Sequence, residues 1–457
     1  MTSRRAGLAL ASLLTVSLTV AACSSGAEPQ GTKTPEPTKK ALQISVGVFG
    51  DDAELAAWDE VVKDRNEANP TVRTKLVKWD DAKDVRSALE KDALPDVFMV
   101  DRDDLGAVLE AKASQPATEM LDERGVDFGD RFSRDALQAM SVEGELQCMP
   151  WSINTEVIYV NTTLVDTDAM RAQDLPVSSR TAWTMRHFAA AAAFAANAET
   201  GTAGVRIEPT LDGLVPFILS GGGKVFDDDA EPTSLAFSSD ETREALEQTL
   251  EVLRDASLTP SDEQLEKSST LQLFKRGKLG LMAGDRSLVP ELRAVKDLSF
   301  DILPIPRMAE LRTTADVSGL CISADSKYPA LAAGLIADMV SDETNAKLIG
   351  SGARTPANLA VGSSDSFLAR DLQPQRSNVF TATLRGAWSP TLSVDWDGLQ
   401  QMVAPYLEQM LSEPGVIDLD AITTQIDEAS RAFLAPEPEE TPAPDASSSA
   451  SPSADAS

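Results

Sequence analysis

Three apolar segments alternate with helix-forming segments near the start of the chain. Between the first two, apolar residues recur at helical spacing until Asn69-Pro70 stops the helix, and a second helix is expected around residues 85–89. The apolar segments have the β-branched composition typical of buried strands and run from Leu42 to Phe49, Val72 to Trp79 and Asp96 to Val100. Alternation at this spacing predicts parallel βαβ units and therefore an α/β fold.

Helical periodicity continues along the rest of the chain. Longer helices are expected over residues 183–196, 239–256, 331–340 and 399–411, and no internal repeat of solenoid period is present. A chain of 457 residues with 42% hydrophobic residues is long enough for two or three domains with a real core.

The first 40 residues differ in composition from the rest. Arg4 and Arg5 precede an apolar run that ends at Ala22, which is typical of a secretory signal and short for a membrane span. Small residues followed by Cys23 resemble the bacterial lipobox, in which the Cys is acylated and becomes the new N-terminus. We therefore expect a lipoprotein signal peptide at 1–22, a lipid on Cys23 and a flexible tether at 23–41. Both the general and the twin-arginine export routes remain open.

This placement sets expectations for partners and cofactors. The mature protein would sit on the extracytoplasmic face of a cell membrane, held by its lipid, so cytosolic cofactors are not expected. The net charge of −31 argues against nucleic acid and against an anionic lipid surface as a second anchor. Residues 435–457 are Pro, Ser, Ala and acidic residues, which predicts a disordered tail.

Two cysteines remain besides Cys23. Cys148 and Cys321 are an even pair in an exported protein, a pattern that permits one disulfide, with two free buried thiols as the alternative. The sequence has no CxxC and a single histidine, so no metal site and no cofactor are expected.

The sequence offers little support for catalysis. His187 lies inside a predicted helix, and no G-x-S-x-G elbow is present. Residues 220–223 (SGGG) lack P-loop spacing and predict a tight turn, and residues 227–229 (DDD) predict a solvated turn. A pair of glycosidase carboxylates is not ruled out by sequence, which leaves a surface glycoside hydrolase as an alternative function.

Eight short motifs occur in the order of one protein family. They are Glu67-Ala68-Asn69-Pro70, Leu94-Pro95-Asp96-Val97-Phe98, Gly144 to Trp151, Val157 to Leu164, Thr181 to Met185, Ser220 to Gly223, Phe274 to Met282, and Pro304-Ile305-Pro306. In this order and spacing, the chain resembles the extracellular solute-binding proteins of ABC importers. The resemblance is to the carbohydrate-type family that includes the maltose-binding proteins.

The resemblance implies a two-lobed periplasmic-binding-protein-like fold of type II. Each lobe would be a mixed sheet flanked by helices, and crossover hinge strands would join the lobes. Lobe one would comprise 42–150 and 322–375, and lobe two 151–321 and 376–434. In this architecture the crossover strands that carry Cys148 and Cys321 run side by side, so the two sulfurs are expected to bond.

The implied function is capture of a carbohydrate or related polyol between the lobes of a monomer, and delivery to an ABC permease. A sensor or adhesin with the same fold is the non-transport alternative. Candidate ligand-binding residues follow predicted strands or lie in segments where the family supplies aromatic contacts. They are Asp51, Asp52, Arg102, Asp103, Trp151, Asn154, Asp285, Arg286, Trp388 and Trp396. The two arginines in this set would also suit an anionic ligand.

Overall fold

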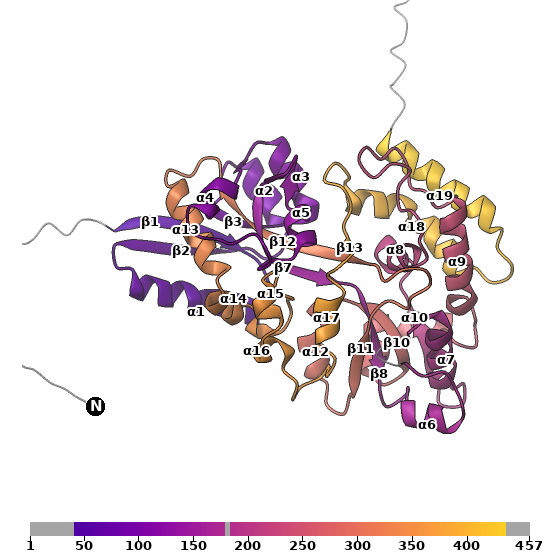
Figure 1. Ribbon diagram of the computed structural model, residues 1–457. Helices are drawn as coiled ribbons and strands as arrows, with labels where there is room; N and C mark the ends of the chain where they lie inside the picture. The colour runs from indigo at the N-terminus through magenta and orange to yellow at the C-terminus, as the bar shows by residue number, and fades with distance from the viewer. Residues whose placement is uncertain (1–40, 179–182, 436–457) are drawn as a thin grey trace, which may run out of the picture. The chain divides into compact units, whose positions relative to one another are not determined.

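A computed structural model describes residues 41–178 and 183–435 and places most strands in two sheets (Figure 1). The predicted signal peptide, Cys23 and the acidic tail after residue 435 lie outside the described residues, as do Thr181 and Ala182 of one family motif. Within the described ranges, no helix is both long and apolar enough to cross a membrane.

The first sheet contains the predicted parallel units. Its order is β13-β12-β3-β1-β2, with β4 and β7 also paired to β12. β1 pairs in parallel with both β2 and β3, which confirms the βαβ prediction, whereas β12 is antiparallel to β3. The strands are β1 (Leu42–Val48), β2 (Val72–Lys78), β3 (Val97–Asp101), β4 (Ser114–Gln115), β7 (Cys148–Thr155), β12 (Thr313–Ser323) and β13 (Ala387–Trp388).

The second sheet has the order β11-β8-β10-β9 and is also mixed. Its strands are β8 (Val157–Asn161), β9 (Ala203–Arg206), β10 (Leu279–Gly284) and β11 (Phe300–Leu303), and β5 (Ser141–Val142) and β6 (Glu145–Leu146) form a separate hairpin. Alternate residues of β8 point to opposite faces. Ile158 and Val160 belong to one hydrophobic core, while Val157 and Tyr159 belong to the other.

The helices divide between these two cores. The first core includes buried side chains of α1 (Asp52–Ala68), α2 (Asp84–Glu90), α3 (Arg102–Glu110), α4 (Thr118–Asp122), α5 (Arg134–Ala139), α11 (Thr270–Lys275), α12 (Val289–Arg293), α13 (Pro329–Met339), α14 (Asp342–Leu348), η2 (Ile349–Ser351), α15 (Leu359–Gly362), α16 (Asp365–Leu368) and α17 (Asn378–Ala382). The second includes those of α6 (Thr167–Ala172), α7 (Met185–Ala195), α8 (Leu211–Ser220), α9 (Asp240–Leu253), α18 (Trp396–Ser412) and α19 (Leu419–Leu434). The remaining helices are α10 (Asp262–Lys267) and η1 (Arg286–Leu288).

Two long strands link the sheets. β7 is buried along its whole length and pairs antiparallel with β12 from Cys148–Cys321 to Thr155–Ala315. Beyond β7, Glu156 leads directly into β8 of the second sheet, and β12 follows β11 along the chain. The chain passes between the sheets again after β13, because Val394 and Leu399 lie in the second core. The exact lobe boundaries given above stay a prediction.

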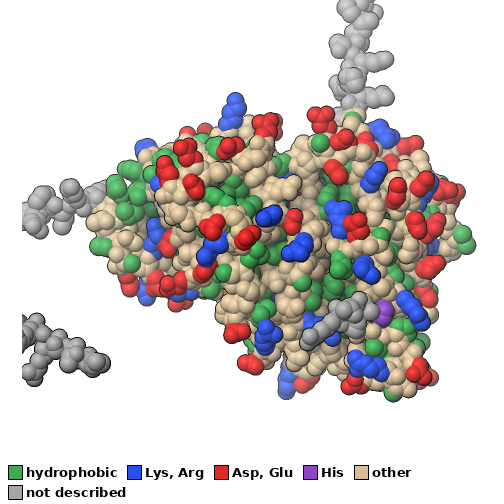
Figure 2. All heavy atoms as spheres, in the orientation of Figure 1, with side chains coloured by type: hydrophobic (Ala, Val, Ile, Leu, Met, Phe, Trp, Pro, Cys, Tyr) green, Lys and Arg blue, Asp and Glu red, His purple; other side chains and the backbone are tan. Residues whose placement is uncertain are grey.

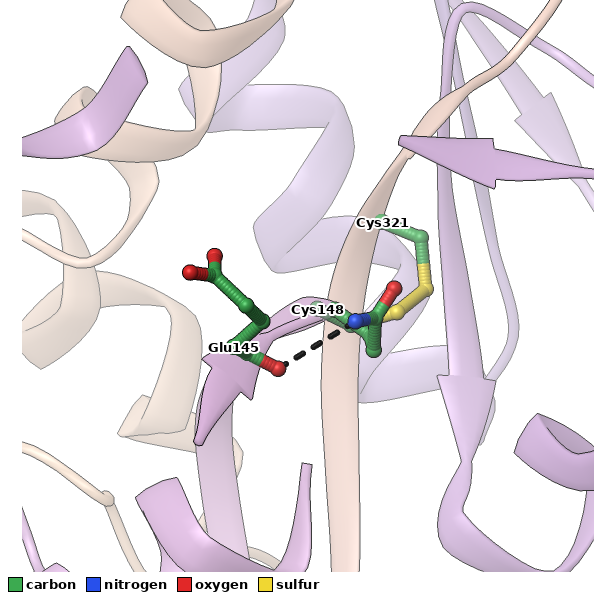
Figure 3. Close-up of a disulfide and its surroundings, with 4 residues drawn as sticks. Glu145, Cys148 and Cys321 are labelled. Atoms are coloured by element: carbon green, nitrogen blue, oxygen red, sulfur yellow. Dashed lines mark hydrogen bonds between the residues drawn. A yellow bond between two sulfur atoms is a disulfide. The ribbon is translucent and has the colours of Figure 1, made fainter. Parts of the chain in front are cut away.

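A disulfide joins the two linking strands. Cys148 and Cys321 are directly opposite each other in the β7–β12 pairing, and their sulfurs are bonded (Figure 3). Both side chains are fully buried. The bond therefore closes a loop across 173 positions of sequence at the point where β7 begins.

Two predicted local features are also present. His187 accepts at Nδ1 from the backbone N–H of Thr184 at 3.4 Å, so it caps the start of α7. The tight turn at residues 220–223 closes α8, with Gly222 at φ +82°, a left-handed conformation that favours glycine.

Replacing both Cys148 and Cys321 with Ala is expected to lower the free energy of unfolding. The chain-entropy account gives an upper limit of roughly 5 kcal/mol for a loop of this length. Urea unfolding of the double variant and of wild type measures the loss, and wild type treated with a reductant is the control. Mass spectrometry that finds both thiols free in air-oxidised protein would contradict the bond.

Candidate functional site

A cavity of about 310 Å³ lies where segments from both sheets meet. It is lined by Arg102, Asp103, Asn154, Glu156, Asp212, Asp285, Thr314, Ala315, Asp316, Trp388, Pro390, Trp396 and Asp397. Six of these residues are carboxylates, one is an arginine and two are tryptophans. The cavity is therefore acidic and has an aromatic wall.

Three of the carboxylates belong to the first turns of helices. Asp103 is near the start of α3, Asp212 near the start of α8 and Asp397 near the start of α18. Backbone N–H groups and the helix dipole favour negative charge at such positions. These helix starts therefore bring negative charge to the cavity at low cost to the fold.

The other three carboxylates come from strands and their ends. Glu156 is the residue between β7 and β8, Asp316 lies within β12, and Asp285 follows β10. Asp285 caps η1 by accepting from the backbone N–H of Ser287 at 2.9 Å. The side chains of Glu156 and Asp316 make no hydrogen bond and no ion pair within residues 41–178 and 183–435.

The pKa values of the cavity carboxyls are raised. The surrounding walls and the charges of Asp285 and Asp212 raise the pKa of Glu156 well above its usual range. The pKa of Asp316 is raised in the same direction, by its surroundings and by Asp101. Asp103 is exposed to the cavity, yet nearby protein and neighbouring carboxylates raise its pKa to about 6. The charged form of these carboxyls is therefore disfavoured unless a positive charge lies near them.

The aromatic wall is a packed pair. The rings of Trp388 and Trp396 are edge to face, with centroids 5.7 Å apart, and both lie about 6 Å from the ring of Phe226. Trp396 Nε1 donates to Asp212 Oδ1 at 2.8 Å, so this carboxylate is held in place. Trp388 is only partly buried and offers more ring surface to the cavity.

A buried ionic cluster lies beside the cavity, centred on Arg354. Its Nε donates to Glu54 Oε1 at 2.8 Å, and its Nη1 donates to Ser318 Oγ at 3.2 Å. Ser318 in turn donates to Asp101 Oδ1 at 2.5 Å. Burial opposes the charge of Arg354, but Glu54, Asp101 and Asp316 together raise its pKa. The guanidinium thus ties α1 to β12 and the end of β3.

The structure brings six of the ten predicted ligand-binding residues to the cavity wall. They are Arg102, Asp103, Asn154, Asp285, Trp388 and Trp396. Two of the six are already engaged within the protein. Arg102 donates to the backbone carbonyl of Ala139. Asn154 donates to Ala353 O at 3.3 Å and accepts from the backbone N–H of Thr355 at 2.9 Å.

The other four predicted residues do not line the cavity. Asp51 caps α1, accepting from the backbone N–H of Glu54 at 2.8 Å, and Asp52 is the exposed first residue of that helix. Trp151 is 1% exposed and packs edge to face on Trp58. Arg286 is the fourth.

Arg286 lies in the interior of the protein. It is 2% exposed, and its guanidinium stacks over the ring of Phe367 at 4.0 Å. Burial lowers its pKa to about 10, so it keeps its charge at neutral pH. Of the two arginines that suggested an anionic ligand, Arg102 alone reaches the cavity.

Four cavity carboxylates were missed from sequence: Glu156, Asp212, Asp316 and Asp397. A signal existed for two of them. Glu156 interrupts an otherwise uncharged and buried stretch from Cys148 to Asn161, and Asp316 is the one charged residue of the mostly buried strand β12. A lone charge inside such a run marks a site where a strand meets solvent or ligand.

A larger hollow of about 1060 Å³ lies elsewhere in the molecule. It is lined by the end of β11, the loop that follows it and α17, and includes Arg307, Arg312, Arg370, Arg376 and Arg385. Four of these arginines are exposed, and neither Trp388 nor Trp396 reaches it. Thr313 of β12 and Leu303 of β11 bring both sheets to this hollow as well. We place the candidate site in the smaller cavity, because the aromatic pair and six of the ten predicted residues line it.

Comparison with known families decides the relationship. The family described as bacterial extracellular solute-binding protein matches residues 60–372, more than half of the chain. The chain belongs to this family. Proteins of this family are extracellular, so the folded part functions outside the cytoplasm. Comparison with curated protein sequences finds no match.

Solved structures of solute-binding proteins share the two-lobed fold at low identity. The sugar-binding protein MalE from Xanthomonas citri has a TM-score of 0.73 at 17% identity, covering 86% of this chain and 98% of that chain. The cyclic α-maltosyl-1,6-maltose binding protein from Arthrobacter globiformis has a TM-score of 0.71 at 15% identity, covering 86% of this chain and 99% of that chain. An ABC substrate-binding protein from Listeria monocytogenes in complex with cycloalternan has a TM-score of 0.70 at 19% identity, covering 86% of this chain and 99% of that chain.

Replacing Asp103 with Asn is expected to change how stability depends on pH. The carboxyl has a pKa of about 6 in the folded protein and about 4 in an unfolded chain. The folded state holds more protons between these values, so the free energy of unfolding falls as pH rises through this window. Asp103→Asn should flatten part of that fall and melt at a higher temperature than wild type at neutral pH.

The measurement is the melting temperature by circular dichroism between about pH 4 and about pH 7. Asp229→Asn removes an exposed carboxylate from a loop outside the cavity and controls for net charge. A wild-type pH profile in Asp103→Asn would show that the carboxyl titrates normally.

Proposed function

We propose that this protein is the lipid-anchored solute-binding component of an ABC importer. It captures a carbohydrate or related polyol in the cavity between its two sheets and delivers it to a membrane permease. The observation that carries the proposal is the cavity itself, which Trp388 and Trp396 line together with polar groups from segments of both sheets. Aromatic faces stack on the C–H faces of sugars, and polar side chains bind the hydroxyls.

The similar proteins support the carbohydrate class. The Xanthomonas structure is that of a sugar-binding protein, and the Arthrobacter structure that of a cyclic α-maltosyl-1,6-maltose binding protein. The Listeria structure is a complex with cycloalternan. These proteins share the fold with this chain at 15–19% identity, so the exact sugar does not follow from them.

Capture would proceed by lobe closure. The strands β7 and β12 are paired through the region that links the sheets, and the pairing shifts register between Ser318 and Gly319. An irregularity of this kind lets paired strands bend locally while the sheets on either side stay rigid. Closure would bring the first-sheet wall, with Arg102 and Asp103, toward the second-sheet wall, with Asp212 and Asp285.

The test is a thermal-shift and calorimetric screen of neutral and charged sugars, polyols, amino acids and peptides. A ligand present at about 100 times its Kd should add about 2.7 kcal/mol to the free energy of unfolding. Trp388→Ala should weaken binding of the best ligand by roughly 1–3 kcal/mol, and Trp388→Phe should retain most of the affinity. Small-angle scattering should show a smaller radius of gyration with saturating ligand.

Several outcomes would count against this function. Steady turnover of a glycoside by the purified protein would favour the hydrolase alternative. Binding unaffected by Trp388→Ala would move the site away from this cavity. An unchanged scattering profile with verified bound ligand would argue against closure.

Lipid anchoring has its own test. Cys23→Ala should release the protein into the medium or leave an unprocessed precursor, because the acylated residue would be missing. Membrane fractionation and mass spectrometry of the N-terminus measure both results. A correctly processed Cys23→Ala protein that still fractionates with membranes would show that another element holds it there.

A further inference from the structure

We propose that the ligand of this cavity is a positively charged carbohydrate, a sugar that carries at least one protonated amine. The inference rests on the proposed function and adds the charge of the ligand to it. The cavity and its aromatic pair mark the site, and the carboxylates decide what charge it accepts.

The charge of the cavity is one-sided. Six carboxylates face a single arginine, and that arginine, Arg102, donates to the carbonyl of Ala139. Arg354, a buried cation beside the cavity, is paired with Glu54, and its charge offsets part of the rise in the pKa of Asp316. The outer surface differs, because acidic and basic side chains are interspersed over the visible face (Figure 2). The excess of carboxylates in the cavity is therefore not explained by the net negative charge of the protein alone.

Internal partners account for some of these carboxylates. Asp397 is paired with the exposed Lys83 at 2.9 Å, Asp285 caps η1, and Asp212 accepts from Trp396. The side chains of Asp103, Glu156 and Asp316 make no hydrogen bond to any residue in the described ranges. Of these three, only Asp103 has a helix start to favour its charge.

Glu156 and Asp316 are thus the decisive pair. Asp316 lies on β12 and Glu156 directly follows β7, so both belong to the segments that link the sheets, and both line the cavity. Burial and, after it, neighbouring carboxylates raise the pKa of each, so a negative charge on these two side chains is disfavoured when no cation is near. A cation placed among them would relieve this repulsion and form charge-assisted hydrogen bonds.

The chemistry favours an organic cation over a metal ion. Within residues 41–178 and 183–435, no group of three or more His, Cys, Asp or Glu is arranged to hold a metal. The carboxylates are distributed around the cavity, and tryptophan faces attract cations as well as sugar rings. A ring-shaped ligand with hydroxyls and an ammonium group matches the carboxylates, the tryptophan rings and the neutral polar groups that line the cavity.

The experiment compares matched sugars by titration calorimetry. The probes are glucosamine and its β-1,4-linked disaccharide and trisaccharide, and the neutral counterparts are glucose, cellobiose and cellotriose, in which a hydroxyl replaces each amine. Spermidine serves as a cation without a sugar ring. Because the attraction is electrostatic, at least one amino sugar should bind roughly tenfold or more tightly than its neutral counterpart, and about 0.5 M salt should reduce this difference.

Three variants place the effect in the cavity. Glu156→Gln and Asp316→Asn should each lower amino-sugar affinity roughly tenfold and lower the affinity for neutral sugars by a smaller factor, because the amide can still bind a hydroxyl but not pair with a cation. Asp229→Asn, which removes the same charge from an exposed loop, should bind like wild type. The melting temperature of each ligand-free variant confirms that it is folded.

Each remaining outcome overturns the inference. Equal or tighter binding of the neutral sugars would refute the charge while leaving the proposed function intact. Tighter binding of spermidine than of every amino sugar would replace the sugar by a linear polyamine. Failure of every cationic probe to bind at millimolar concentration would show that the carboxylates do not form a cation site.

Discussion

The pairing of β7 with β12 is the interaction on which the rest of the structure depends. These strands come from segments far apart in sequence, and they carry the chain between the two sheets. β7 is buried throughout, so every backbone group along it must find a partner inside the protein. The Cys148–Cys321 bond fixes one end of the pairing, and Glu156 and Asp316 lie at the other end, in the cavity. The disulfide and the candidate binding site therefore lie on the same pair of strands.

Two features of the fold offset the repulsion among the cavity carboxylates: a buried arginine beside the cavity, and the starts of three helices at its wall. Arg354 is buried with Glu54 and lies close enough to Asp101 and Asp316 for their charges to raise its pKa. A buried ion pair is costly to form, but removal of one partner costs more because the other is left uncompensated. Helix starts at Asp103, Asp212 and Asp397 favour three more negative charges. These devices let the fold keep an acidic site that would otherwise repel itself.

Much of the fold could be predicted because it depends on local periodicity. The runs from Leu42 and Val72 became β1 and β2, the helical spacing around Trp58 became α1, and their parallel pairing follows from the helix between them. The motifs in family order extended this to a two-lobed fold, which the family match and the solved structures confirm. The site was less predictable. Asp103, Asn154 and Trp388 reach the cavity, whereas the side chains of Trp151 and Arg286 turn into the interior.

By itself, the sequence determined the order of strands and helices, the α/β class and the residues that end each strand, since these depend on neighbours a few positions away. Only the tertiary structure decided which side chains in and after a strand face the cavity. Trp151 within β7 and Glu156 just after it lie five positions apart, yet Trp151 packs on Trp58 whereas Glu156 lines the cavity. Such choices depend on segments hundreds of residues away, and those segments meet when both sheets have formed. The acidity of the site is therefore a property of the assembled fold.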